Sequence, residues 1–185
     1  LLDGEELVKW SGDFSRFSME DGTKLRNPKH IGVGAYKRGV VFHKVELRPA
    51  GAAPATSAPN PPPSAGVVTG TAPSGPGWID LLALADVEKD AVLGRWRKEA
   101  ANLICGAGEA KAHPALQLPV TLTGSYEMEF EFTRHGPAGT VSVHLPLAAD
   151  RSVIAHMQEF SPYAGLVNVG GKNTRDPDNP TRVPH

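Results

Sequence analysis

The stretch Tyr126-Glu-Met-Glu-Phe-Glu-Phe132 decides the fold class of this chain, because apolar and acidic residues alternate along it without interruption. Successive side chains of a β-strand point to opposite faces, so the alternation predicts a strand with one apolar and one charged face. The same kind of pattern recurs in the segments 116–118, 140–145 and 152–157. Short strands separated by turn residues at this spacing are typical of an antiparallel β-sandwich or barrel.

Further strands are expected on both sides of this region. Segments 31–36 and 40–47 are rich in apolar strand formers, and Lys37-Arg38-Gly39 between them predicts a β-hairpin. Within the second segment, alternation predicts one face with Val41, His43, Val45 and Leu47 and an opposite face with Val40, Phe42, Lys44 and Glu46. Shorter elements are expected at 7–10, 78–84, 94–96 and 101–105, whereas 173–185 ends without a closing strand.

The middle of the chain has a different composition. Residues 51–77 read GAAPATSAPNPPPSAGVVTGTAPSGPG, with no charged or aromatic residue and 7 of the 17 prolines. Such a segment has little apolar surface to bury, and its prolines favour an extended, polyproline-like chain. It predicts a linker between a first piece, 1–50, and a last piece, 78–185. The first piece is too short to form a good core without help.

The segments on either side of the linker carry a resemblance to a known family. It lies in Asp90-Ala-Val-Leu-Gly-Arg-Trp96, Leu118-Pro119, Gly124-Ser-Tyr126, Glu131-Phe-Thr-Arg134, Tyr163-Ala-Gly-Leu166 through Gly171-Lys172, and before the linker in Leu1-Leu-Asp-Gly4, Trp10-Ser-Gly-Asp13, Ile31-Gly-Val-Gly34 and Val41-Phe-His-Lys-Val-Glu-Leu47. These patterns resemble concanavalin A-like lectin and glucanase jelly-roll modules, in particular the 3-keto-disaccharide-hydrolase-like and laminin-G-like domains of large planctomycete-type bacterial proteins. The match is one of strand residues, so it indicates a fold more specifically than an activity.

The resemblance implies an all-β fold, an antiparallel β-sandwich of jelly-roll type that is incomplete. Residues 1–50 resemble the C-terminal strands of one module, and 78–185 resemble the N-terminal two-thirds of the next. Either the two pieces assemble into one permuted sandwich, or each keeps unpaired strand edges that invite association with other chains. A linker of 27 residues hardly opposes closure, because loop entropy rises only logarithmically with length. We therefore expect one permuted sandwich.

Glu127, Glu129 and Glu131 are the sharpest candidates for catalysis, because period-two spacing places the three carboxylates on one strand face. Laminarinase-type glucanases, which share the jelly roll, carry alternating acids on a concave-face strand, although the central acid is usually Asp. Retaining hydrolysis needs two carboxyl groups about 5 Å apart, a separation that side chains two positions apart on a strand can reach. The simpler interpretation is a solvated polar face opposite an apolar face, and we favour it.

Trp10, Trp96 and Tyr163 are candidate ligand-binding residues, and Trp78 could also stack on a sugar ring if exposed, because an aromatic face complements the C–H face of a pyranose. Tryptophans that anchor the packing of sheets are commoner. The histidines lack helical metal-ligand spacing, so no metal site is predicted; those in predicted strands, His43, His144 and His156, are expected to cover one sheet face. The loop acids Asp86, Asp90, Asp176 and Asp178 are the candidates for calcium, and no other cofactor is expected.

The charge of the chain excludes two classes of partner. The net charge is −1, with 9 basic and 7 acidic residues before the linker and 10 against 13 after it. Neither piece has the basic excess that nucleic acid or an anionic membrane requires, and no apolar run is long enough to span a bilayer. The lone Cys105 excludes an internal disulfide without fixing the compartment. The start at Leu1, without Met or a signal, suggests a piece of a longer polypeptide, and an extracytoplasmic location is slightly favoured.

Three functions stay open at this point. The first is a non-catalytic β-sandwich module of a larger bacterial protein, which binds glycans or another partner or acts as a spacer between modules of the same polypeptide. The second is a glycoside-acting enzyme that uses Glu127, Glu129 and Glu131 on a concave sheet face. The third is a truncated fragment without independent function. We favour the first, because a proline-rich linker between modules is typical of multidomain proteins.

Overall fold

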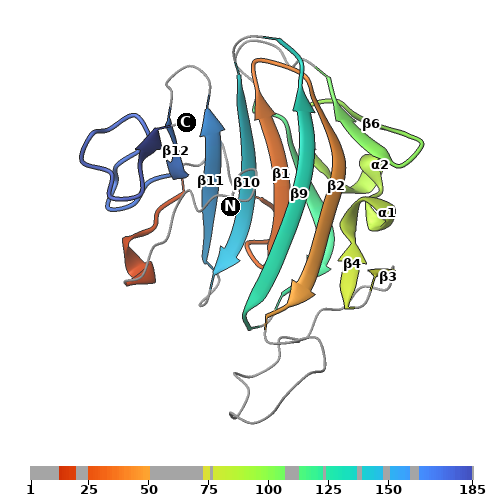
Figure 1. Cartoon of the computed structure of the whole chain (residues 1–185), viewed down its shortest axis with the longest axis horizontal. Helices are drawn as coiled ribbons and strands as arrows, with labels where there is room; N and C mark the ends of the chain where they lie inside the picture. Colours follow the sequence, from red (N-terminus) through yellow and green to blue (C-terminus); the bar gives the residue numbers. More distant parts are fainter. Residues whose placement is uncertain are drawn as a thin grey trace.

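The computed structural model describes residues 13–19, 25–50, 73–75, 77–106, 113–122, 124–136, 139–147, 151–158 and 163–184. This part of the chain consists mainly of antiparallel strands, which form two sheets packed against each other (Figure 1). The expected all-β antiparallel sandwich is therefore confirmed. The strand expected at 7–10, with Trp10, and residues 51–72 and 76 of the predicted linker lie outside the described residues. The prediction that the linker extends to residue 77 is wrong, because Pro73–Gly75 is a strand that pairs with Trp78–Asp80.

The first sheet contains seven of the described strands. In spatial order they are β13 (Val183–Pro184), β12 (Tyr163–Leu166), β11 (Arg151–Gln158), β10 (Thr140–Leu147), β1 (His30–Tyr36), β8 (Ala115–Thr121) and β5 (Ala91–Leu93). Three of them, β8, β10 and β11, confirm the strands predicted at 116–118, 140–145 and 152–157. β13 corrects the prediction that no strand closes the C-terminal region, since Val183 pairs with Ala164. An edge strand tolerates prolines because its outer N–H groups need no partner.

The second sheet contains six of the described strands. They are β9 (Tyr126–Arg134), β2 (Val40–Pro49), β4 (Trp78–Asp80), β3 (Pro73–Gly75), β7 (Asn102–Cys105) and β6 (Trp96–Glu99). On one side β2 pairs with β9 from Val40 to Pro49, and on the other its two ends pair with β4 and β7. The segment 78–84, expected as helix or strand, contains a strand followed by a helix. β4 runs directly into the short helix α1 (Leu81–Leu84), because the Asp80 carboxylate caps the first turn.

β1 and β2 lie in different sheets, so the hairpin predicted for them is wrong (Figure 1). The connection between them passes through Lys37, whose φ of 66° turns the chain from one sheet to the other. Each strand has a fully buried face, with Val33 on β1 and Phe42 on β2. In a sandwich the two strands lie in opposite sheets, so their apolar faces bury each other. If the two strands were neighbours in one sheet, both apolar faces would need a further layer to cover them.

The strands that precede the linker occupy the centre of both sheets. β1 pairs with β10 on one side and with β8 on the other, and β2 pairs with β9, β4 and β7. The two pieces of the chain therefore form a single sandwich, as expected. The linker joins strands that belong to the same core.

The core lies between the sheets. Phe42 is fully buried, with the rings of Trp96 and Phe132 at centroid distances of 6.4 and 6.3 Å. Cys105 is also buried, and burial raises the pKa of its thiol to about 12, in agreement with its prediction as a small apolar core residue. A smaller cluster forms where Phe17, after the 3₁₀ turn Phe14–Arg16, packs with Val153 and Val169. Among the described residues, no helix has the length and apolar character needed to cross a membrane.

Candidate functional site

β9 carries the three glutamates that are the catalytic candidates. Side chains alternate between half-buried and exposed along the strand, and Glu127, Glu129 and Glu131 are all on the exposed side. The intervening Met128, Phe130 and Phe132 pack against the core between the sheets. The glutamates therefore point away from the core, on the outer face of the six-stranded sheet.

Cations on β2 pair with two of these glutamates. Arg48 is opposite Glu127 in the ladder and donates its Nε–H to Glu127 Oε2 at 2.6 Å. Lys44 Nζ lies 3.1 Å from Glu129 Oε1 and 3.1 Å from Glu46 Oε2. These contacts raise the pKa of Lys44, and the hydrogen bond to Glu46 is the largest cause. Two cations of β2 are thus interleaved with four carboxylates of β2 and β9.

A β-bulge in β2 decides which of its residues face outward. The register with β9 shifts between Phe42 and Lys44. The buried residues are Val40, Phe42, Val45 and Leu47, while His43, Lys44, Glu46 and Arg48 are at least partly exposed. The predicted division of 40–47 into two faces is therefore wrong beyond His43, because one extra residue exchanges the faces. Alternation alone therefore does not predict that Lys44 and Arg48 lie beside the glutamates.

An aromatic ring extends this arrangement onto a third strand. The Arg48 guanidinium lies over the ring of Trp78, with Cζ 4.6 Å from the ring centroid. Trp78 is half-buried in β4, which pairs with β2. Glu127, Arg48 and Trp78 therefore form a row across β9, β2 and β4. We call the outward side chains of these strands the glutamate face, which comprises Glu127, Glu129, Glu131, Lys44, Glu46, Arg48 and Trp78.

The two predicted ligand-binding aromatics that the structure describes, Trp96 and Tyr163, lie in different sheets. Trp96 is half-buried, packs against the core and donates its indole N–H to the Leu93 carbonyl at 3.0 Å, which favours the anchoring interpretation. Tyr163 is half-buried in β12 of the other sheet, with the Arg182 guanidinium over its ring. Trp10 lies outside the described residues. A ligand-binding role for these three residues stays a prediction.

The strand histidines divide between the two sheets. His43 is exposed on the six-stranded sheet, where its ring nitrogens lie 2.8 Å from Thr133 Oγ1 and 3.2 Å from Asn102 Oδ1. His144 and His156 belong to β10 and β11 of the seven-stranded sheet. The expectation that all three histidines cover one face is therefore wrong, because β2 is part of the opposite layer.

His144 and His156 lie on the outer face of the seven-stranded sheet. Their strand neighbours Val141, Val143 and Met157 belong to the core between the sheets, and strand alternation turns the histidines the other way. His144 is 3% exposed, and its Nδ1 has no hydrogen-bond partner in the described part of the chain. We call this region, with Ser142 opposite His156, the histidine face.

Burial keeps both imidazoles of the histidine face neutral. It lowers the pKa of His144 to about 4. It also lowers the pKa of His156 to about 3, with smaller contributions from the charges of His144, His113 and Arg175. Both values are well below the ordinary value near 6.5, so neither side chain carries a charge at neutral pH.

Gly34 makes room for polar atoms on this face. A Cβ at Gly34 would lie 2.6 Å from Ser142 Oγ and 2.8 Å from the Pro114 carbonyl oxygen. Ser142 is opposite Gly34 in the ladder between β1 and β10. The segment that precedes β8 therefore covers the strand backbone closely, which contributes to the burial of the histidine face.

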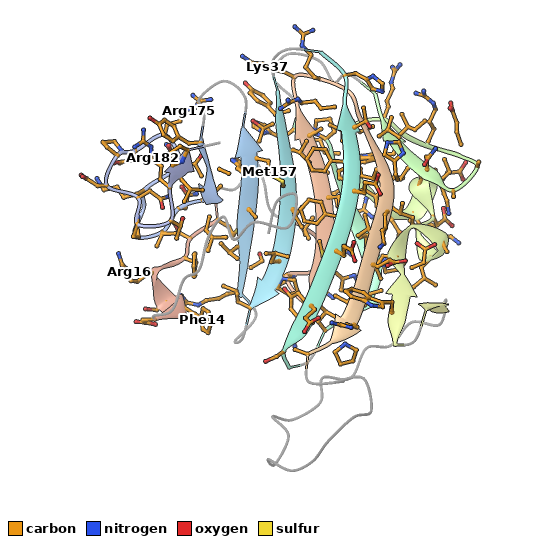
Figure 2. All side chains as sticks on the ribbon, in the orientation of Figure 1. Phe14, Arg16, Lys37, Met157, Arg175 and Arg182 are labelled. Atoms are coloured by element: carbon orange, nitrogen blue, oxygen red, sulfur yellow. The ribbon has the colours of Figure 1, made fainter. Side chains whose placement is uncertain are left out.

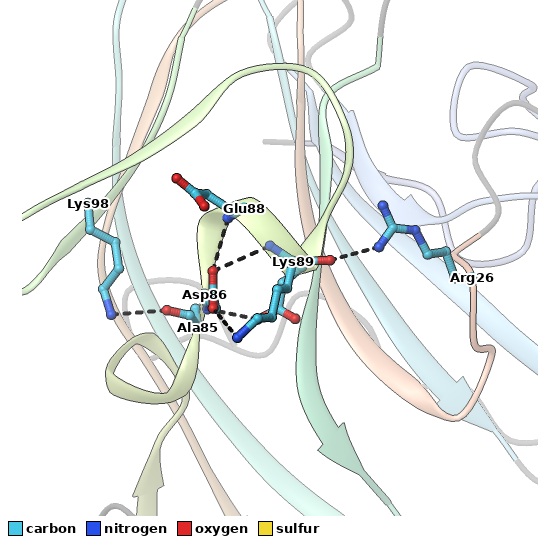
Figure 3. A network of polar contacts seen from close by, with 7 residues as sticks. Arg26, Ala85, Asp86, Glu88, Lys89 and Lys98 are labelled. Carbon is cyan, nitrogen blue, oxygen red and sulfur yellow. Dashed lines mark hydrogen bonds and ion pairs between the residues drawn. The ribbon is translucent and has the colours of Figure 1, made fainter.

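The loop acids Asp86 and Asp90, predicted as calcium candidates, take part in a local network (Figure 3). Asp86 caps the short helix α2 (Val87–Asp90) and lies 2.9 Å from Lys89 Nζ. The hydrogen bond from the Lys89 side chain is the largest cause of the lowered pKa of Asp86. Asp90 accepts the Asp86 backbone N–H at 2.8 Å. These carboxylates are engaged in helix capping and charge pairing.

The other two calcium candidates, Asp176 and Asp178, lie near Lys172, whose Nζ is 3.2 Å and 3.9 Å from their Oδ2 atoms. Among the residues that the structure describes, no three His, Cys, Asp or Glu side chains are grouped closely enough to hold a metal ion. The described part of the chain therefore offers no calcium site at the predicted acids.

Comparisons of the chain with protein-family models, with curated proteins and with solved structures found no match. The function is therefore argued from the two outer faces of the sandwich. The glutamate face presents exposed charges and a tryptophan, and the histidine face presents buried neutral imidazoles.

Proposed function

We propose that this chain is a concanavalin A-like jelly-roll module of a larger bacterial protein, and that it binds a glycan without cleaving it. One observation carries the proposal. Glu127 and Glu129 are exposed carboxylates in ion pairs with Arg48 and Lys44. A carboxylic acid that protonates a glycosidic oxygen is normally held in apolar surroundings. The Glu127 and Glu129 side chains are instead 48% and 57% exposed.

The row of Glu127, Arg48 and Trp78 is suited to recognition of a sugar. Its carboxylate and guanidinium provide acceptors and donors for hydroxyl groups. The indole presents an apolar surface of the kind that complements the C–H face of a pyranose ring. Because all three residues are on paired strands of a rigid sheet, a ligand would meet them in a fixed arrangement.

The architecture supports a single binding module. The strands before and after the linker share one core, so the sandwich does not need a second copy to close. The proline-rich segment connects two strands of this one sandwich, so its composition does not bear on neighbouring domains. The jelly-roll resemblance lies in strand residues, so the glycan-binding role depends on the surface groups rather than on the fold.

The proposal is tested by measuring binding and cleavage together on the purified chain. We expect at least one soluble polysaccharide to bind, with no release of reducing ends during prolonged incubation. Trp78→Ala is expected to weaken binding severalfold, because it removes the apolar platform of the row. Phe14→Ala is the matched control, since Phe14 is an exposed aromatic residue (47% exposed) on the 3₁₀ turn, away from β4.

Two outcomes would contradict the proposal. Release of reducing ends that disappears when Glu127, Glu129 and Glu131 are all changed to Gln would establish a glycoside hydrolase. Absence of binding together with absence of a cooperative thermal transition would identify a fragment without independent function.

A further inference from the structure

Two arginines beside β12 have no ion pair within the described part of the chain. Arg182 lies over the Tyr163 ring, with Cζ 3.3 Å from the ring centroid, and its buried Nε has no hydrogen-bond partner there. Arg175 is exposed on the loop that leads to β13. Figure 2 shows both side chains on the same side of the sandwich, next to β12.

The carboxylates of this loop are already engaged. Lys172 pairs with Asp176 and lies 3.9 Å from Asp178. Asp176 also accepts the Asp178 backbone N–H, and this hydrogen bond is the largest cause of its lowered pKa, whereas the charge of Arg182 is the smallest. Lys172, Arg175 and Arg182 thus face two carboxylates, so the described groups of this region have an excess of one positive charge.

The histidine face continues into this charged region. His156 is opposite Gly165 in the ladder between β11 and β12, and Tyr163 lies two positions further along the same strand face. Neutral His156 does not add to the positive charge, and the charge of Arg175 contributes to its lowered pKa.

Two buried polar atoms of this region have no hydrogen-bond partner among the described residues. They are Arg182 Nε and Oγ1 of Thr174, a fully buried residue adjacent to Arg175. Buried polar groups are usually paired, so these two atoms require an explanation. A bound anion at Arg175 and at the accessible edge of the Arg182 guanidinium would balance the excess positive charge of this region.

We infer that Arg175 and Arg182 form a binding site for a carboxylate group, and that the ligand is a glycan that contains uronic acid. The glycan class rests on the proposed function, whereas the carboxylate requirement rests on two arginines that have no ion pair among the described residues. A stacked guanidinium keeps its planar set of N–H donors free at its edge, which suits two-point recognition of a carboxylate. Tyr163 holds Arg182 in this way.

The test compares an oligogalacturonate with a neutral galactose oligomer of the same length, by calorimetric titration at low and moderate salt. We expect the acidic oligomer to bind more tightly, and Arg175→Gln to weaken its binding by about tenfold or more, since a hydrogen bond between charged groups is lost. Arg182→Lys is expected to weaken it as well, because the charge stays but the planar donor set is lost. Arg95→Gln is the matched control, an exposed arginine at the turn between β5 and β6.

The outcomes separate this inference from the proposed function. If both oligomers bind equally and Arg175→Gln does not change their binding, the carboxylate site is overturned. Glycan binding, and with it the proposed function, then still stands. If neither oligomer binds but a poly-glutamate peptide does, in an Arg175-dependent way, the carboxylate site stands and the glycan class is overturned. If no carboxylate ligand binds while Arg175→Gln unfolds normally, the inference fails.

Discussion

The two outer faces of this sandwich carry titratable side chains in opposite ways. On the glutamate face Glu127 and Glu129 are exposed, and they form ion pairs with Arg48 and Lys44 across the strands. On the histidine face the side chains are buried, and burial removes their charge instead of pairing it. The comparison teaches that a polar strand face remains charged where water reaches it and becomes neutral where other segments cover it.

The largest expected difference between the faces is their response to acid. The folded pKa values of His144 and His156 lie below the unfolded value near 6.5, so the unfolded chain takes up protons first. The free energy of unfolding should therefore fall as the pH drops below 6.5, by about 1.4 kcal/mol per pH unit for each histidine. The loss should stop near pH 4 for His144 and near pH 3 for His156.

Urea unfolding between pH 7 and pH 4.5 measures this effect. The double variant His144→Gln/His156→Gln should show a clearly flatter profile over the same range, whatever its stability at pH 7. His43→Gln, an exposed histidine on the other sheet, should retain the profile of the natural chain. A double variant that keeps the full slope would show that the histidine face does not control acid stability.

The second prediction concerns the close covering of the histidine face. Gly34→Ala places a methyl group 2.6 Å from Ser142 Oγ and 2.8 Å from the Pro114 carbonyl oxygen. Because the carbonyl belongs to the backbone and cannot rotate away, the change should cost about 1–3 kcal/mol. Gly106→Ala is the control in the other sheet, where the nearest atom would be 3.8 Å away. Equal melting temperatures for the two variants would contradict close packing over Gly34.

A smaller effect is expected from the ion pair of Arg48 with Glu127. Both side chains are partly exposed, so the pair should contribute no more than about 1 kcal/mol. A double-mutant cycle with Arg48→Gln and Glu127→Gln measures the coupling, which should decrease in 1 M salt because screening weakens exposed pairs. A coupling of about 3 kcal/mol that does not change with salt would show that the pair behaves as a buried ion pair, and would contradict the prediction.

The smallest effect is expected for Glu131→Gln. This exposed residue is opposite Lys44 in the ladder, but Lys44 is already paired with Glu46 and Glu129. Its replacement should change the free energy of unfolding by less than about 0.5 kcal/mol. Thermal unfolding of Glu131→Gln and Glu129→Gln under the same conditions compares the stability that each replacement removes. A larger loss of stability for Glu131→Gln than for Glu129→Gln would contradict the pairing of Lys44 with Glu129.

The amino-acid sequence by itself determined the strands and their apolar faces. Alternation in 126–132 predicts both the existence of β9 and the side to which each glutamate points. It does so because the period of a strand is a local property of the backbone. Composition likewise predicts that 51–77 joins two pieces, and alternation predicts a sandwich as the way to bury their apolar faces.

Only the tertiary structure decided which strands are neighbours and which residues meet across them. The crossing from β1 to β2 between sheets, and the bulge after Phe42, depend on packing against distant strands. That bulge brings Arg48 to Glu127, and the ladder between β11 and β12 brings His156 towards Arg175 and Arg182. Local periodicity contains no information about such partners, because they are separated by long stretches of chain and a one-residue shift in register exchanges the faces of a strand.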